Sequence, residues 1–128
     1  MKNKVTVLGQ EYKIEYHRNK DDIKLENCFG YHEQFSKKIV IDQDLIDEST
    51  GKTYNPKTSE NLEIYVNKVY RHEIIHAFFE ESGLTYKFDR TEDEDFVVDW
   101  IARMYPKMQK IFEELGVAEW IYFANRKH

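Results

Sequence analysis

The sequence predicts one α+β domain, in which a small antiparallel sheet packs beside a long helix and a second helix with an acidic start. Segments rich in β-branched residues lie between residues 4 and 42, whereas helical periodicity dominates from about residue 59 to residue 115. The chain has 128 residues, of which 41% are apolar and 34% charged, as is usual for one globular domain. Residues 117–128 form an apolar tail after the helical part.

Three short strands are expected in the first third of the chain. Residues 5–8 are mostly β-branched and residues 12–16 alternate apolar and polar side chains, with a glycine in the connection, which is typical of a β-hairpin. The apolar segment Lys38–Asp42 is expected to join this hairpin in the sheet. The polar residues 19–34 are interpreted as a loop with a turn at Gly30.

A long helix is expected in the middle of the chain. It follows residues 43–57, whose carboxylates lack the offsets of a calcium-binding loop and therefore predict a solvated connection. Thr58 or Ser59 can cap the helix at its start, and Gly83 is placed to end it after Ser82.

Two further helical segments are expected towards the C-terminus. The first begins near Thr91, and Pro106 is expected to end or kink it, because proline removes a helical hydrogen bond and its ring clashes with the preceding turn. Residues 107–115 then predict a third helical piece, which Gly116 closes.

The long helix carries the pattern His-Glu-x-x-His at His72, Glu73 and His76. Residues four apart share a helix face, so the two imidazoles can point at one zinc ion. The surrounding segment is apolar nearly all round, and burying two histidines and a glutamate is costly unless a metal or a hydrogen bond satisfies them. Two alternatives stay open: surface histidines on an ordinary helix, and core histidines satisfied without a metal.

A third zinc ligand is expected from the acidic start of the next helix. Glu94 is favoured because it shares a face with the apolar residues Val97, Val98 and Ile101, while Glu92 and Asp95 are alternatives. The pair Thr91 and Glu94 also fits a capping box, in which Glu94 would bond to the helix start instead.

The remaining polar candidates have simpler interpretations. Asp99 can orient a ligand histidine through its second ring nitrogen, or pair with Arg103 one turn further along. His17 and His32 lack partners at ligand spacing and are expected to be surface or hydrogen-bonded residues. Cys28 is expected to be a semi-buried thiol.

Composition and local sequence features argue against nucleic acid as a partner and against a membrane location. The formal net charge is −5 and the basic runs are short, which argues against nucleic acid. No apolar run reaches the length of a membrane span, and the N-terminus lacks the features of a signal peptide. A single cysteine suits a reducing compartment, so a cytoplasmic protein is expected.

Residues 70–84, around the motif, resemble the motif helix of small phage and prophage zinc-peptidase-like proteins of the minimal gluzincin type. Residues 96–102 are similar to the second helix of that family, and the likeness extends from Val5 to about Leu115. The resemblance implies a zincin-like fold with His72 and His76 as zinc ligands and Glu73 as the general base. The third ligand would be an acidic residue of the next helix.

The function implied is that of a zinc metallopeptidase, in which zinc-bound water hydrolyses a protein or peptide substrate in the bacterial host cytoplasm. The strand Lys38–Asp42 could bind the peptide by strand addition. Tyr86, Tyr105 and Tyr122 are candidates for stabilising the oxyanion. The alternative is a non-catalytic, zinc-stabilised phage protein that binds a protein partner through the apolar residues 120–123.

Overall fold

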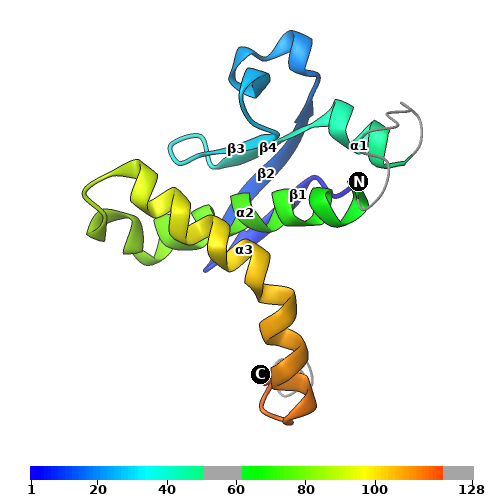
Figure 1. The fold of residues 1–128 in the computed structure, drawn as a ribbon. Coiled ribbons are helices and arrows are strands. Elements are labelled where there is room, and N and C mark those ends of the chain that lie inside the picture. Colours follow the sequence, from blue (N-terminus) through cyan, green and yellow to red (C-terminus); the bar gives the residue numbers. More distant parts are fainter. Residues whose placement is uncertain (51–61, 120–128) are drawn as a thin grey trace.

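The computed structural model describes residues 1–50 and 62–119 and shows an α+β arrangement (Figure 1). A four-stranded sheet in the order β1-β2-β4-β3 lies against the long helix α2, and α3 crosses α2 on the side away from the sheet. The elements are β1 (Lys4–Val7), β2 (Gln10–His17), η1 (Asn19–Asp21), η2 (Ile23–Glu26), β3 (Gly30–Glu33), β4 (Lys38–Asp42), α1 (Gln43–Ser49), α2 (Leu62–Ser82), η3 (Leu84–Lys87) and α3 (Thr91–Glu114). No helix in the described ranges has the length and apolarity to cross a membrane.

The N-terminal hairpin is confirmed. Strands β1 and β2 are antiparallel and are joined by a two-residue turn, in which Leu8 and Gly9 have φ values of 49° and 85°. Positive φ at both central residues is the conformation whose twist matches a hairpin, and glycine adopts it without steric cost. Tyr12 and Ile14 of β2 are buried beneath α2, as their alternation predicts.

The expected antiparallel sheet is wrong in one pairing, because β2 and β4 run parallel. The two strands are joined by residues 18–37. Residues 19–34 of this connection, for which the sequence predicts a loop, contain η1, η2 and the short strand β3. Strand β3 is antiparallel to β4 and lies at the edge of the sheet. A connection of this length can cross over and insert β4 beside β2 in the parallel direction.

The inserted strand β4 is central, which corrects two expectations. Since β2 and β3 occupy both of its edges, Lys38–Asp42 cannot bind a peptide by strand addition. The chain after it is helical rather than an open connection as far as residue 49. The Asp42 carboxylate accepts a hydrogen bond of 2.8 Å from the Asp44 N–H and so caps α1.

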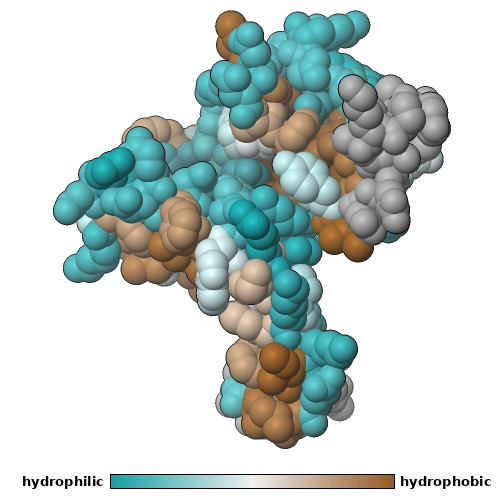
Figure 2. All heavy atoms as spheres, viewed as in Figure 1, coloured by the Kyte–Doolittle hydropathy of each residue, from teal (hydrophilic) through white to brown (hydrophobic). Residues whose placement is uncertain are grey.

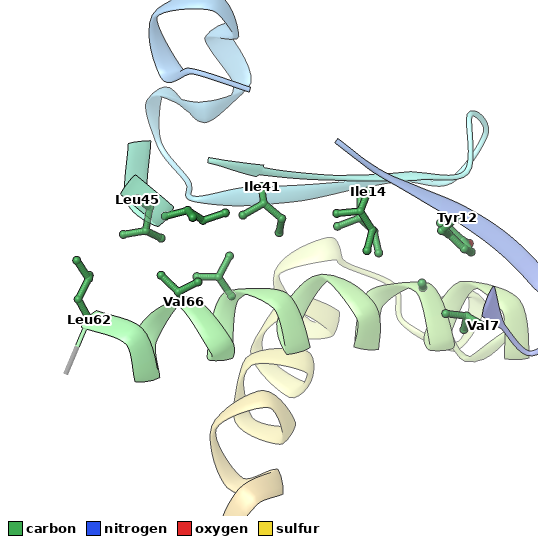
Figure 3. Packing of buried hydrophobic residues seen from close by; sticks show 11 residues of the cluster. Val7, Tyr12, Ile14, Ile41, Leu45, Leu62 and Val66 are labelled. Carbon is green, nitrogen blue, oxygen red and sulfur yellow. The ribbon is translucent and has the colours of Figure 1, made fainter. Parts of the chain in front are cut away.

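The main core lies between the sheet and α2 (Figure 3). Side chains of the strands and of α1 meet apolar side chains of α2 spaced three or four residues apart, which is the spacing of one helix face. The buried residues are Val7, Tyr12, Ile14, Ile39, Ile41, Leu45, Ile46, Leu62, Val66, Val69 and Ala77. This packing fixes α2 as the element on which the candidate site is built.

Helix α2 ends at Ser82, as expected, and Gly83 follows with φ of 82°. The left-handed conformation at Gly83 turns the chain into η3, which leads to α3. The proposed caps Thr58 and Ser59 lie outside the described residues, as do residues 120–128 of the apolar tail, which include Tyr122.

Helix α3 does not end at Pro106, so the expected third helical piece is the second half of α3. Proline leaves the carbonyl four residues earlier, that of Ala102, without its helical N–H donor. The Arg71 Nε of α2 donates to this carbonyl at 2.9 Å, which replaces the missing bond. Beyond this point α3 extends away from the sheet, and apolar side chains gather at its far end (Figures 1 and 2). The exposed ones are Ile111 and Phe112 of α3 and, just after the helix, Leu115 and Val117.

Candidate metal centre

A cavity of about 680 Å³ lies between strand β3, helix α2 and the start of α3. Its lining includes the three motif residues His72, Glu73 and His76, together with residues 27–32. The acidic start of α3 forms the opposite wall. The fold therefore brings the motif, an edge strand and several carboxylates to one concave surface, which is where small-molecule and peptide sites are usually found.

The two imidazoles of the motif converge on one point, as their spacing predicts. His72 Nε2 and His76 Nε2 are 3.2 Å apart, and Asp95 Oδ1 of α3 lies 3.0 Å from the first and 3.1 Å from the second. Three potential donor atoms thus form a nearly equilateral triangle. The ligand atoms of His72, Glu73 and His76 also all lie within 4.8 Å of one another.

This triangle has the size that a zinc ion requires. Ligands about 2.0–2.1 Å from a tetrahedral zinc ion are roughly 3.3–3.4 Å from each other. The three donors would have to separate by only about 0.1–0.4 Å to accept the ion. Two imidazole nitrogens and a carboxylate oxygen are also a donor set that zinc prefers, so these residues fit the metal.

Asp99 holds the His72 ring in the orientation that such a site needs. Its Oδ1 lies 3.2 Å from His72 Nδ1, so a proton on Nδ1 leaves the Nε2 lone pair directed at the triangle. Asp99 also pairs with Lys68 at 2.6 Å and with Arg103 at 3.0 Å, so the expected pairing with Arg103 is confirmed, while its role towards a ligand histidine stays a prediction that the contact with His72 supports. Burial opposes ionisation, but the hydrogen bonds from Lys68 and Arg103 lower the pKa of Asp99 to about 2.

Glu73 is buried, with 6% of its surface exposed, beneath the triangle. Burial raises the pKa of Glu73 to about 8; the Asp95 carboxylate adds to this rise and Lys68 opposes it. Gly30 of β3 permits the close packing, since a Cβ there would lie 3.3 Å from Glu73 Cγ and 3.0 Å from the Val40 carbonyl oxygen. A side chain at this position would push the strand away from the helix.

His32 is a member of the site that sequence reasoning missed. Its ring stacks on the His76 ring with centroids 6.2 Å apart and an interplanar angle of 8°. Its Nε2 is buried and has no hydrogen-bond partner among the described residues, so the expected hydrogen bond is absent at this nitrogen, while the residue as a whole is partly exposed. Burial and the neighbouring His76 lower the pKa of His32 to about 4, and burial likewise lowers the pKa of His76. Both rings are therefore neutral at physiological pH.

Of the three acidic candidates on α3, the structure places Asp95 beside the imidazoles. Glu94 is buried and accepts a hydrogen bond from the Thr85 hydroxyl, while Glu92 pairs with Arg90 at 3.1 Å. The capping-box interpretation is wrong, since Arg90 is the N-cap and no side chain caps the helix. Glu94 lies in the cavity wall and is the alternative third ligand.

Two of the expected oxyanion tyrosines, Tyr86 and Tyr105, belong to the described residues, and neither contributes to the cavity wall. Tyr86 donates to Glu80 at 2.6 Å. The tyrosines that do line it are Tyr31 and Tyr65. Tyr31 donates to Asp22 at 2.5 Å.

Comparison of the chain with protein-family models, with curated proteins and with solved structures finds no match. The likeness to minimal gluzincins therefore stays a prediction made from residues. A proposal for the function therefore depends on the distances and burial of the residues around His72 and His76.

Proposed function

We propose that the protein is a zinc-dependent peptide hydrolase with a zincin-like site. The observation that carries this proposal is the triangle formed by His72 Nε2, His76 Nε2 and Asp95 Oδ1, with separations of 3.0–3.2 Å. His72, His76 and Asp95 would hold the zinc ion, with Glu94 as the alternative third ligand. A catalytic zinc site has three protein ligands and one open position, and the adjoining cavity gives that position access to substrate.

Glu73 is the residue proposed to move the proton. A bound zinc ion supplies Lewis acidity, which acidifies water and polarises a carbonyl group. The buried carboxylate of Glu73 has a raised pKa, so it accepts a proton readily and can donate it to the departing amine. Its neighbour Lys68 and a nearby dication both favour the ionised form needed for the first of these steps.

The substrate is proposed to lie along the free edge of β3. The Asp42 N–H donates to the Phe29 carbonyl at 2.9 Å, which makes Phe29 and Asp42 a hydrogen-bonded pair. Hydrogen-bonded and non-hydrogen-bonded pairs alternate in an antiparallel ladder, so the main-chain groups of Gly30 and His32 face away from β4. Both residues line the cavity, where an extended peptide could pair with them.

The test is the substitution Glu73→Gln in zinc-loaded protein, with a mixture of synthetic peptides as substrate and mass spectrometry as the readout. We expect zinc content to be unchanged and the cleavage rate to fall by about 10²–10⁴-fold, because the proton acceptor is lost. Glu63→Gln, at an exposed position of the same helix, is the matched control and should cleave normally. Normal cleavage by Glu73→Gln would exclude this mechanism.

The exposed apolar end of α3 favours one alternative, a non-catalytic protein in which zinc stabilises the fold and the surface binds a protein partner. Coordination of the zinc-loaded protein separates the two, because a structural site has four protein ligands and a catalytic site keeps one position for water. X-ray absorption spectroscopy of the zinc-loaded protein measures the number and type of the zinc ligands.

A further inference from the structure

Arg71 and Pro106 are 35 positions apart in the sequence, yet they act on the same carbonyl group. Pro106 lies inside α3 and has no N–H, so the Ala102 carbonyl lacks the donor that a regular helix would provide. Ala102 is fully buried, with 0% of its surface exposed, so water cannot replace that donor. The Arg71 Nε from α2 donates to this carbonyl at 2.9 Å.

In a regular helix the carbonyl already accepts one helical N–H, so a side chain from a neighbouring helix can add only a second bond to it. Proline makes the Ala102 carbonyl available, and the result is a direct bond between α2 and the backbone of α3. Such a bond fixes the position of α3 along α2 more firmly than apolar packing, which is not directional.

Both residues that form this bond lie close in sequence to candidate metal ligands or to residues that contact them. Arg71 immediately precedes His72 on α2, while Asp95 and Asp99 lie seven and three residues before Ala102 on the same side of α3. Asp99 Oδ1 is 3.2 Å from His72 Nδ1, and Asp95 Oδ1 is 3.0 Å from His72 Nε2. Sliding α3 by one residue, about 1.5 Å, would break both contacts.

We propose that Arg71 is a positioning residue of the metal centre: through the carbonyl that Pro106 leaves free, it holds α3 where Asp95 meets His72 and His76. This inference rests on the proposed metal-dependent function. Arg71 touches no substrate or metal, and its role is to set the distance between the helices.

Four proteins test this role: the wild type, Arg71→Met, Pro106→Ala and the double variant. Thermal unfolding of the metal-free proteins measures stability, and competition with a chelator together with the cobalt(II) absorption spectrum measures the metal site. Arg71→Met should lower both the unfolding temperature and, by about tenfold, the affinity for cobalt, as outer residues of metal sites do. Lys110→Met removes an exposed cation from the far half of α3 and should change neither property.

The double variant distinguishes two roles of Arg71: holding α3 in position against α2, and supplying a hydrogen bond to the buried Ala102 carbonyl. The alanine that replaces Pro106 supplies the missing N–H to the Ala102 carbonyl, so the double variant should regain stability relative to Arg71→Met. Its cobalt affinity should stay low and its spectrum altered, because the bond between the helices is still absent. Recovery of cobalt affinity together with stability, or unchanged affinity in Arg71→Met, would overturn the proposal. A wild-type protein that binds neither zinc nor cobalt would instead overturn the metal centre itself, and this role with it.

Discussion

The histidine of β2 and the histidines of α2 both lie between carboxylates, but the two clusters are built differently. His17 Nδ1 is 2.7 Å from Asp22 and its Nε2 is 2.9 Å from Glu15, so each carboxylate binds a separate nitrogen of one ring. In the α2 cluster, two Nε2 atoms and Asp95 Oδ1 meet at mutual distances of 3.0–3.2 Å. The composition of the clusters is similar, and only the second has donor atoms that surround a common point.

The surroundings of His17 and of His76 shift their pKa values in opposite directions. The hydrogen bond to Asp22 raises the pKa of His17, with burial opposing and Glu15 adding to the rise. Burial lowers the pKa of His76, although Asp95 acts in the other direction. His17 therefore tends to hold a proton between two carboxylates, whereas His76 keeps a free lone pair that a metal can use.

The largest expected effect is on metal affinity when a converging histidine is removed. His76→Ala should weaken zinc binding by more than about 100-fold, since the loss of a ligand exceeds the cost of losing an outer residue. His17→Ala is the matched control and should bind zinc like the wild type. Competition with a chromogenic chelator measures both, and equal losses in the two variants would contradict the comparison.

The next largest effect on zinc affinity is expected when the third ligand is removed. Asp95→Ala should lower zinc affinity by about 10–100-fold, whereas Glu94→Ala should mainly lower stability, because Glu94 is buried and bonds to Thr85. Titration with zinc and thermal unfolding of each variant provide the two measurements. The opposite pattern would make Glu94 the ligand, as its place on the apolar face of the helix predicts.

A smaller effect is expected from the carboxylate that orients a ring without meeting the metal. Asp99→Asn should reduce zinc affinity by about tenfold, because the amide holds the His72 ring less well than the carboxylate. Asp22→Asn makes the same change beside His17 and should leave zinc affinity unaffected. The same chelator competition decides this, and a loss of affinity in Asp22→Asn would show that the clusters are not independent.

The smallest effect concerns the pH dependence of stability. The pKa of His17 is raised in the folded protein, so its contribution is fully present below its ordinary value of 6.5 and is lost as pH rises through the folded value. The stability difference between wild type and His17→Gln should therefore be larger at pH 5.5 than at pH 9, by about 0.2–1 kcal/mol for such a partly exposed ion pair. Urea unfolding at the two pH values measures it, and a larger difference at pH 9 would refute the assignment.

Local pattern was sufficient for several elements of this fold. The hairpin, the strand Lys38–Asp42 and the end of the motif helix at Ser82 follow from side-chain alternation, a turn glycine and a helix-ending glycine. Strand β3 was missed because its four residues are too short to show alternation and follow a polar segment. The parallel pairing of β2 and β4 was missed because strand direction depends on the path of the chain between them.

The continuity of α3 was missed for a different reason. Proline weakens a helix by leaving a carbonyl unpaired, and sequence rules count that loss without knowing what lies nearby. Here Arg71, from another helix, supplies the missing donor. The contact that keeps α3 continuous therefore comes from tertiary structure, and no local sequence feature around Pro106 reveals it.

The sequence by itself determined that His72 and His76 share a face of a helix, because that relation depends only on helical geometry and on the four-residue spacing. Which carboxylate meets them was decided by tertiary structure. Glu94 and Asp95 are adjacent, and successive residues of a helix point about 100° apart, so the packing of α3 on α2 selects one over the other. It directs Asp95 to the imidazoles and Glu94 to Thr85.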